Sequence, residues 1–293
     1  MEYKQLKEDA CRYVDELKPL IYEIADKLHA RPELGQEEFF ASSLLKDILT
    51  DHGFTIDNPV ADAFPTAFHG TLGKGPFQMG FLAEYDALPK IGHGCGHNLI
   101  AAMSIGAALA FAKAAGDKAT VHVYGCPAEE TVGSKVYMSE HGVFDALHAA
   151  VIVHPGVDKT YIGGTSYATH PLQFTFWGKS AHVADTEYHG INALDALVDF
   201  YARLKEYEKT LTERHIIGAI ITEGGTAPNI VPDRAVLKAT IRALTVDYLE
   251  NKMLPDIKQM AQDVAAAHQA SVEMVHYEPL YKNMINDPKM DVY

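Results

Sequence analysis

Residues 77–98 read FQMGFLAEYDALPKIGHGCGHN, and this stretch decides how the first half of the chain is expected to fold. Its first part, Phe77 to Glu84, is mostly apolar and predicts a buried strand, whereas the small-residue segment Leu99 to Ala115 predicts a helix. The loop between them is too polar and too rich in glycine for core packing. Because open α/β sheets place their sites in loops at the carboxyl ends of strands, this loop is the first candidate site.

The segments around this stretch continue the alternation of helix and strand. Upstream, apolar residues spaced three and four apart predict helices, with a break at Pro19 and a later helix that Gly53 ends. Short strands are predicted at Phe54 to Ile56, Thr120 to Tyr124 and Ala149 to Val153. Strands that alternate with helices indicate an α/β sheet.

The second half of the chain has a different order of elements. From about Ser166 it runs strand, helix, strand, strand, helix, strand, which is the split β-α-β order of ferredoxin-like α+β domains. These elements are Leu172 to Trp177, Ile191 to Tyr207, Ile216 to Thr222, Ala235 to Leu244, Leu249 to His268 and Ser271 to Tyr277. Since no Ser/Pro-rich linker separates the halves, we expect the second domain to be inserted into the first. The expected bounds are 1–164 for the first domain, 165–277 for the second, and 278–293 for the start of a return to the first.

Composition limits the classes of function. The chain has 293 residues with 25 Lys plus Arg and 39 Asp plus Glu, a formal net charge of −14, so nucleic acid is not an expected partner. No apolar run approaches the ~20 residues that cross a bilayer, and the charged N-terminus lacks the apolar core of a secretory signal, so no membrane association is expected. Three cysteines cannot build a disulfide framework. We therefore expect a cytoplasmic protein.

Three successive strands are each followed by side chains that can bind a metal. Cys95 and His97 stand two residues apart in the glycine-rich loop, where a thiolate and an imidazole can converge on one cation. The next strand leads into Glu129 and Glu130, and the strand after it into His154. Two adjacent carboxylates are costly to bury together, and one solution is that one binds a cation while the other transfers protons.

The same residues also have structural interpretations. Cys95 taken alone would be a buried thiol, and adjacent glutamates are common on exposed turns. His93 is as readily a loop histidine bonded to a carbonyl as a ligand, and Cys126 is expected in the core rather than at a metal. The neighbours of Cys95 and the place of the glutamates after a buried strand favour ligands.

The chain carries eight short motifs in a fixed order. They are Leu28-His29-x-x-Pro32-Glu33-Leu34-Gly35, Asp86-Ala87-Leu88-Pro89, Cys95-Gly96-His97, Pro127-Ala128-Glu129-Glu130, His154-Pro155, Gly178-Lys179-Ser180-Ala181-His182, Gly190-x-Asn192-Ala193 and Asn229-x-x-Pro232. Together they resemble the aminoacylase and carboxypeptidase metallohydrolases over nearly the whole chain. The likeness is strongest to the amidohydrolase branch, which includes hydrolases of N-acyl amino acids, aminobenzoyl-glutamate and auxin conjugates and certain dipeptidases.

The resemblance implies an α/β two-metal catalytic domain with an inserted ferredoxin-like domain that dimerises or acts as a lid. It implies a metal-dependent amidohydrolase that holds two divalent ions per chain, zinc, manganese or cobalt, and cleaves the amide bond of small N-acyl or N-aminoacyl amino acids. By this resemblance Cys95, His97, Glu130 and His154 are metal ligands. A homodimer formed through the inserted domain is also implied.

The resemblance also implies roles for five further residues. Glu129 would be the general base that takes a proton from a metal-activated water, and Asp86 would orient the ligand loop. His182 would stabilise the oxyanion, reaching in from the other protomer of the dimer, while Asn229 and Arg242 would hold the substrate carboxylate. Composition alone makes His182 a surface residue, and Arg242 is equally readable as the partner of a surface acid.

Two features depart from the family pattern. Family members are longer and place their last histidine ligand near the carboxyl end, whereas only a polar stretch follows Tyr277 here, so a C-terminally truncated chain is expected. His276 precedes that return and is not assigned the role. Asn98 stands where many relatives have Asp, which could weaken the orientation of the ligands.

Two other functions stay open at this point. One is a catalytically impaired binding or assembly homologue that lacks one metal ligand, which metal content would separate from the enzyme. The other is a thiol hydrolase in which Cys95 is the nucleophile and His97 or His93 the base. Activity retained in excess chelator would indicate that second alternative.

Overall fold

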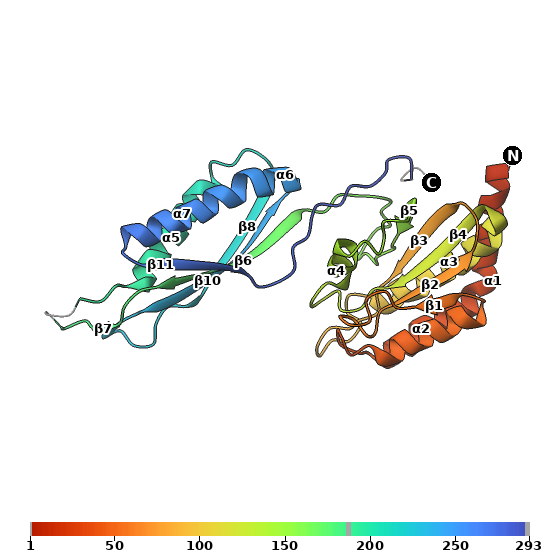
Figure 1. The fold of residues 1–293 in the computed structure, drawn as a ribbon, viewed down its shortest axis with the longest axis horizontal. Helices are drawn as coiled ribbons and strands as arrows, with labels where there is room; N and C mark the ends of the chain where they lie inside the picture. The colour runs from red at the N-terminus through yellow and green to blue at the C-terminus, as the bar shows by residue number, and fades with distance from the viewer. Residues whose placement is uncertain (1, 186–188, 291–293) are drawn as a thin grey trace. The chain divides into compact units, whose positions relative to one another are not determined.

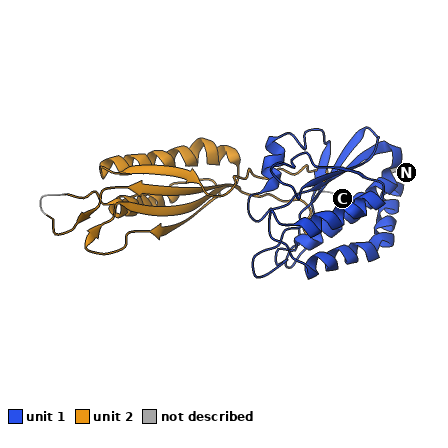
Figure 2. Cartoon of the chain, turned by 60° about the horizontal axis from the view of Figure 1, so that its bottom comes forward, with its two compact units in different colours: residues 1–159 blue, residues 160–293 orange. Residues whose placement is uncertain are grey.

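The computed structural model describes residues 2–185 and 189–290, and the chain forms two compact units, residues 1–159 and 160–293 (Figure 2). Residues 152–167 connect the last strand of the first unit to the first strand of the second, and they contain no helix or strand. The boundary predicted after residue 164 lies within this connecting segment.

The first unit is built on a five-stranded mixed sheet (Figure 1). Its spatial order is β1-β2-β4-β3-β5, with the bounds β1 Thr55–Asp57, β2 Phe68–Gly73, β3 Phe77–Ala83, β4 Ala119–Gly125 and β5 Ala149–Val151. β3 runs parallel to both β4 and β5, whereas β2 pairs antiparallel with β1 and β4. The carboxyl ends of β3, β4 and β5 therefore meet at one edge of the sheet, as the sequence predicted.

One strand of this sheet was not predicted. β2 contains two glycines in six residues, which interrupt the apolar alternation that signals a strand. At Gly70 an added Cβ would lie 3.2 Å from side-chain atoms of Ile56 and Leu49, so β2 is packed closely against its neighbours. Gly70 therefore makes the strand hard to recognise in the sequence, although the close packing of β2 requires a glycine there.

Four helices accompany the sheet: α1 Glu2–Ala30, α2 Phe39–Asp51, α3 His97–Ala115 and α4 Ser134–Glu140, with a 3₁₀ turn at Gly116–Lys118. Buried residues of α1, α2 and α3 share one hydrophobic cluster with β2, β3 and β4, so these helices pack on the same face of the sheet. Met138 of α4 belongs to another cluster, with Tyr124 and Cys126. Cys126 is fully buried, as expected for a core cysteine.

The predicted break at Pro19 is wrong, because α1 continues through this residue. A proline inside a helix removes one hydrogen bond, which costs about 3 kcal/mol. Leu17 precedes Pro19, whereas Leu20, Ile24 and Leu28 follow it, and all four pack in the same core cluster. This continuous apolar stripe holds the helix together across the lost hydrogen bond.

The expectation that no apolar run approaches the length of a membrane span also needs correction. The segment His97–Lys118, which contains α3, has 22 residues and a mean hydropathy of 1.7. Half of its most apolar window is buried inside the protein, which is what the core helix of a globular unit also shows. The length of this apolar segment is not obvious in the sequence, because many of its residues are small, mostly alanine, rather than bulky and apolar.

The second unit is an antiparallel sheet covered by helices, and its predicted ferredoxin-like order is confirmed. The four main strands lie in the order β11-β6-β10-β8, with β6 Ala168–Trp177, β8 His215–Glu223, β10 Arg234–Ala243 and β11 Ser271–His276. The helices are α5 Ala193–Glu208, the short α6 Val246–Tyr248, a π-helical turn Leu249–Met253, and α7 Leu254–Ala267. α5 and α7 cover one face of the sheet (Figure 1). The rings of Phe174 and Phe176 pack against Phe200 in the core.

Two smaller features complete the second unit. β7 Ala181–His182 and β9 Ile230–Val231 form a short antiparallel ladder of their own. Beyond β11 the chain runs along the same unit, where Tyr281 forms a β-bridge with Thr169 and the Asn283 side chain accepts a hydrogen bond from the Val246 amide.

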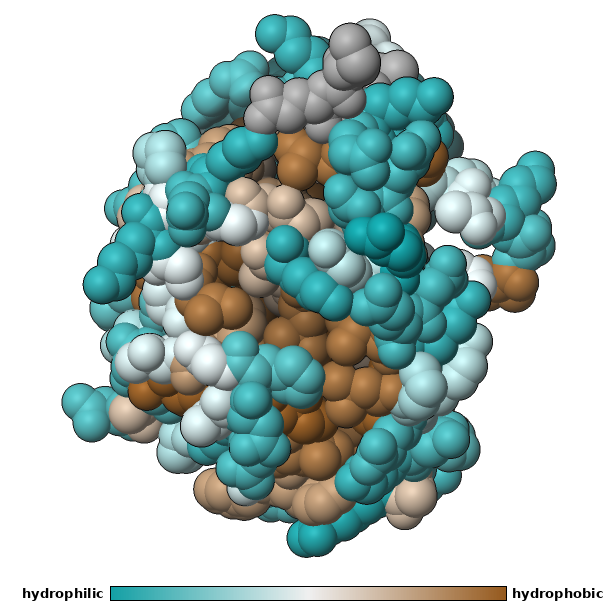
Figure 3. Space-filling view, turned by 90° about the vertical axis from the view of Figure 1, so that its right-hand side faces the viewer, coloured by the Kyte–Doolittle hydropathy of each residue, from teal (hydrophilic) through white to brown (hydrophobic). Residues whose placement is uncertain are grey.

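One face of the molecule exposes apolar side chains. Figure 3 shows them gathered in a hollow that hydrophilic side chains surround. In the first unit, a cavity of about 330 Å³ lies among α1, α3 and the end of β2, where Leu17, Leu72 and Leu109 are among the lining residues. The helices on this side of the sheet therefore do not close completely over the core.

Candidate metal centre

The loops after β3, β4 and β5 bring the predicted ligands of the first unit together. Cys95 Sγ lies 3.6 Å from His154 Nε2, although 59 residues separate them in the chain. One ligand atom from each of Cys95, His97 and His154 lies within 4.8 Å of the other two. Two ligands of one tetrahedral zinc, a sulfur at ~2.3 Å and a nitrogen at ~2.0 Å, are about 3.5 Å apart, so these side chains fit a shared cation.

The glycine of the Cys95-Gly96-His97 motif shapes this site. Gly96 has φ +82° and directly precedes the first residue of α3, His97. A Cβ at Gly96 would lie 2.8 Å from Cγ of Pro155, next to His154. Only glycine combines this backbone conformation with so close an approach, which lets the His154 loop reach the start of α3.

His97 is held in one tautomer by Asp86. The His97 ring is fully buried, and its Nδ1 donates a hydrogen bond of 2.8 Å to Asp86 Oδ1. Burial lowers the pKa of His97, but the hydrogen bond and charge of Asp86 outweigh it and leave the pKa raised. With the Nδ1 proton held by Asp86, the Nε2 lone pair points into the site, where this buried atom has no hydrogen-bond partner. A carboxylate behind a ligating imidazole is the usual support of a metal ligand.

Asp86 also holds the second ligand loop. Its Oδ2 accepts a hydrogen bond of 2.9 Å from the backbone N–H of Glu130. Burial raises the pKa of Asp86, but the hydrogen bonds from His97 and Glu130 more than offset this, so its pKa lies below the ordinary value. One buried carboxylate thus connects the loops after β3 and β4.

Three further carboxylates surround the unpartnered His97 nitrogen. His97 Nε2 lies 3.4 Å from Glu84 Oε2, 3.6 Å from Glu130 Oε1 and 3.8 Å from Glu129 Oε2. Glu84, His97 and Glu129 form a second group whose ligand atoms lie within 4.8 Å of one another. Carboxylates that converge on one imidazole repel one another unless positive charge lies among them, so the donor set fits divalent metal ions.

The electrostatics do not favour a free thiolate at Cys95. Burial, followed by the hydrogen bond and charge of Glu130, raises the pKa of Cys95 to about 12. A cysteine nucleophile needs a cationic neighbour that lowers its pKa, whereas the neighbours here are carboxylates. The arrangement therefore suits a thiol that loses its proton to a metal better than a thiol hydrolase.

Glu129 has the environment of a proton acceptor. Burial is the largest influence on its carboxyl and raises its pKa, with Glu84 and Glu130 acting in the same direction and Lys135 against them. Lys135 lies on α4 and forms an ion pair with the buried carboxylate of Glu84. A carboxylate with a raised pKa beside metal ligands can receive a proton during hydrolysis.

The segment 33–38 fastens both loops that carry the site. The Ala87 amide donates a hydrogen bond of 2.8 Å to the Glu33 carbonyl, and Leu34 and Ala87 form a parallel bridge. The fully buried Glu38 accepts hydrogen bonds from the Ala128 amide at 2.7 Å and from Thr66 Oγ1 at 2.9 Å. Ala128 has φ +56°, and this unusual turn directly precedes the two glutamates. The first of the eight motifs therefore has a structural role in the site.

Asn98 and His93 lie outside both candidate ligand groups. The Asn98 side chain donates a hydrogen bond of 3.1 Å to the Ala25 carbonyl, so it fastens the start of α3 to α1. His93 is in neither candidate ligand group, and burial lowers its pKa.

The predicted residues of the second unit lie in two places. His182 on β7 and Asn229 beside β9 approach each other, with 3.5 Å between His182 Nε2 and Asn229 Nδ2. Arg242 is exposed on β10, opposite Thr169 of β6 and Ile216 of β8. β10 begins at Arg234, close to the β7–β9 ladder, so Arg242 lies about 26 Å further along the strand. Within this unit the structure brings His182 and Asn229 together but not Arg242.

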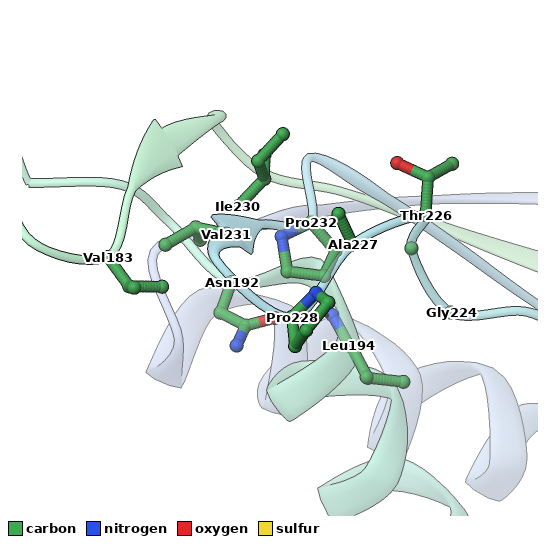
Figure 4. Close-up of a pocket in the computed structure, with 11 residues that line it drawn as sticks. Val183, Asn192, Leu194, Gly224, Thr226, Ala227, Pro228, Ile230, Val231 and Pro232 are labelled. Atoms are coloured by element: carbon green, nitrogen blue, oxygen red, sulfur yellow. Dashed lines mark hydrogen bonds between the residues drawn. The ribbon is translucent and has the colours of Figure 1, made fainter.

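A cavity of about 420 Å³ lies in the second unit, and its lining includes the chain neighbours of His182 and Asn229 (Figure 4). Its lining is mainly apolar and comes from the start of α5, the β7–β9 ladder and the loop after β8: Val183, Asn192, Leu194, Gly224, Gly225, Thr226, Ala227, Pro228, Ile230, Val231 and Pro232. The Asn192 side chain caps α5 by accepting hydrogen bonds from the amides of Leu194 and Asp195.

Sequence reasoning missed three residues of the first unit's site. Glu84 was visible as the end of a strand but received no role, although its position after a buried strand was the same signal that selected Glu129. Lys135 and Glu38 gave no signal, since neither stands in a spacing typical of ligands. Their buried contacts become apparent only in the folded chain.

Comparison with known proteins confirms the resemblance inferred from the motifs. Residues 171–273 match the model of the peptidase dimerisation domain. The chain is 32% identical to the Xaa-Arg dipeptidase of Mus musculus, over 85% of this chain and 61% of that protein. It is 30% identical to a p-aminobenzoyl-glutamate hydrolase protein of Escherichia coli strain K12, over 92% of this chain and 58% of that protein. The chain thus spans about three fifths of the length of these relatives.

A solved structure shares the fold. It is that of a Bacillus subtilis protein described as a dinuclear metal-binding peptidase from the M20 family, with a TM-score of 0.70 and 20% sequence identity. The match covers 94% of this chain and 77% of the other. The predicted fold class, an α/β unit joined to a ferredoxin-like α+β unit, is confirmed.

Proposed function

Because residues 171–273 match the model of the peptidase dimerisation domain and the chain is similar to a dipeptidase and to an aminobenzoyl-glutamate hydrolase protein, we propose that it is a metal-dependent amidohydrolase. Its substrates are small N-acyl or N-aminoacyl amino acids. The observation that carries this proposal is the convergence of Cys95, His97, Glu130 and His154 around the buried, unpartnered Nε2 of His97.

The role proposed for each side chain follows from its contacts. Cys95, His97, Glu130 and His154 would hold divalent ions, and such ions would polarise the scissile carbonyl and lower the pKa of water. Glu129 takes the proton that the attacking water loses, since burial raises the pKa of Glu129 and its carboxylate lies beside the proposed metal ligands. Asp86 keeps the His97 proton on Nδ1 and the Glu130 backbone in place.

The second unit supplies substrate contacts in this proposal. His182 stabilises the oxyanion from the other protomer of the dimer, and Asn229 binds the carboxylate of the substrate. The proximity of His182 and Asn229 supports a joint role for these two. The guanidinium of Arg242 suits the same carboxylate, but its place further along β10 separates it from Asn229 of the same chain.

A homodimer through the second unit and a reducing compartment such as the cytoplasm belong to the same proposal. β8 is an edge strand of its sheet and exposes Ile216, Ile220 and Ile221, which supports pairing with a second copy. Cys11, Cys95 and Cys126 are free thiols, which supports a reducing environment.

The test is hydrolysis by protein of defined metal content. The purified chain is stripped with chelator, reloaded separately with zinc, manganese or cobalt, and assayed against acylated amino acids, aminobenzoyl-glutamate and dipeptides. Activity that disappears with the metal and returns on reloading is expected. Activity that persists in excess chelator would overturn the proposal in favour of the thiol hydrolase. Less than one tightly bound ion per chain would favour the binding or assembly homologue.

A further inference from the structure

We propose that Glu84 is an additional metal ligand of this centre, held in position by Lys135. The inference rests on the proposed function, because it assumes that the centre binds divalent ions. Glu84 lies one residue beyond the end of β3 and was assigned no role from the sequence.

The burial of Glu84 is the first observation. The residue is only 3% exposed, so its carboxylate is removed from water. Oε1 is paired with the ammonium of Lys135, whereas Oε2 is buried without a hydrogen-bond partner. A carboxylate oxygen in this state is costly, and it indicates a positively charged partner that completes the site.

The atom that Glu84 Oε2 faces is the second observation. His97 Nε2 lies 3.4 Å away and is also buried without a partner. In the neutral ring that donates its Nδ1 proton to Asp86, Nε2 presents a lone pair, and two lone-pair atoms face each other. A charged hydrogen bond between them would be about 2.8 Å long, so a shared proton does not explain the separation. Nitrogen and oxygen ligands of one tetrahedral ion, each about 2.1 Å from it, lie about 3.4 Å apart.

Lys135 explains how Glu84 can serve as a ligand without being repelled by its neighbours. Glu84, Glu129 and Glu130 all lie within 4 Å of His97 Nε2. Lys135 neutralises one of these charges and binds the Glu84 oxygen that faces away from the imidazole. The ion pair thereby fixes the rotamer that directs Oε2 into the centre.

The two variants that break this ion pair distinguish a ligand from a structural partner. Glu84→Gln keeps an acceptor for Lys135 but removes the negative charge, whereas Lys135→Met leaves the Glu84 charge in the site. If Glu84 is a ligand, Glu84→Gln weakens cobalt or zinc binding at least about 10-fold, while Lys135→Met, which removes the support but leaves the charged ligand in the site, weakens binding less. If the pair is only structural, the two variants weaken metal binding equally.

Metal affinity and stoichiometry are measured on the full chain, stripped with chelator and titrated with cobalt or zinc against a chromophoric chelator. Glu140→Gln, at an exposed residue of α4, is the matched control and is expected to bind like the parent. An unchanged affinity in Glu84→Gln, or an equal loss in Glu84→Gln and Lys135→Met, overturns the inference. If the parent chain itself binds no metal, the proposed function fails first and this inference with it.

A second readout covers the case in which Lys135→Met does not fold. The d–d absorption bands of bound cobalt report its ligand number and geometry, so the cobalt-loaded Glu84→Gln protein is compared with the loaded parent. Changed bands are expected for a lost ligand. Identical spectra at full cobalt occupancy overturn the inference.

Discussion

The carboxylate of Glu38 accepts a hydrogen bond of 2.7 Å from the backbone amide of Ala128, 90 residues further along the chain. Glu38 is fully buried, and its other oxygen accepts a hydrogen bond from Thr66. Because Ala128 immediately precedes Glu129 and Glu130, this contact ties the proposed base and a proposed ligand to the start of α2. A residue outside the metal centre thus fixes the turn on which the centre depends.

Replacing Glu38 with alanine is expected to loosen this turn. The change leaves the Ala128 amide and the Thr66 hydroxyl without their acceptor, which is expected to lower the free energy of unfolding by about 3 kcal/mol. Urea denaturation measures this loss. Glu38→Gln keeps one acceptor oxygen and is expected to lose less stability and to retain more metal. Equal losses in the two variants would contradict a role in which the acceptor matters.

The pH dependence of stability tests the ionisation of Glu38. Burial is the largest influence on this carboxyl and raises its pKa, although the hydrogen bonds from Ala128 and Thr66 act in the opposite direction. The folded chain therefore binds this proton more tightly than the unfolded chain, so its contribution to stability is present at acid pH and falls as pH rises through the folded pKa. Relative to Glu38→Gln, the parent should lose stability in urea titrations as pH rises above about 4.3, the ordinary pKa of glutamate. Parallel curves would contradict this.

Gly35 is expected to tolerate no side chain. A Cβ at this position would lie 2.6 Å from Thr131 Oγ1 and 3.1 Å from Cα of Ala128. Gly35→Ala should therefore displace the turn that carries Glu129 and reduce kcat at least about 10-fold, since small displacements of positioned groups are costly in catalysis. The double variant with Thr131→Ala removes the nearest clash and should recover part of the rate. A fully active Gly35→Ala protein would show that the turn can move freely.

Glu129→Gln tests the proposed base without changing the size of the side chain. General base catalysis typically contributes about 10²–10⁴-fold, so kcat is expected to fall by this factor while the metal content stays the same. Steady-state kinetics and metal analysis of the same preparation measure both quantities. Glu140→Gln serves again as the control, and a Glu129→Gln protein with parental kcat would assign the base elsewhere.

The second unit offers a test that is independent of the metal. The Asn192 side chain accepts hydrogen bonds of 3.0 Å and 3.3 Å from the amides of Leu194 and Asp195 at the start of α5. Asn192→Ala removes this cap and should cost about 1 kcal/mol of stability, whereas Asn192→Asp should preserve it. Thermal unfolding of the three proteins gives the ranking. An Asn192→Asp protein as unstable as the alanine variant would point to a contact other than the cap.

The sequence was most informative where composition changes abruptly. The apolar run 77–84 predicted a strand, and the structure has β3 there. The glycine-rich loop predicted a site and contains Cys95, and the small-residue segment after it predicted the helix that is α3. The ferredoxin-like order was equally readable, because its strands and helices have regular apolar periodicity. Parallel strands then brought distant ligands to one edge of the sheet.

What the sequence could not show depends on contacts that no local pattern records. Pro19 normally ends a helix, but packing against the core outweighs that preference in α1. Glu38 and Lys135 acquire their roles from single buried partners at distances of 90 and 51 residues in the chain. The failure at β2 has the same origin, since Gly70 is explained by the close packing of Ile56 and Leu49 against it.

The attachment of the Ala128 turn to Glu38 also has a consequence for the order in which the protein matures. During synthesis the Glu38 carboxylate stays hydrated until translation has passed residue 128, and closing so long a loop carries an entropic cost that local helices do not. Cys95 and His97 are therefore synthesised before the hydrogen bond between Glu38 and Ala128 can form. The geometry of the candidate metal centre is completed only after the loop that follows β4 has joined it.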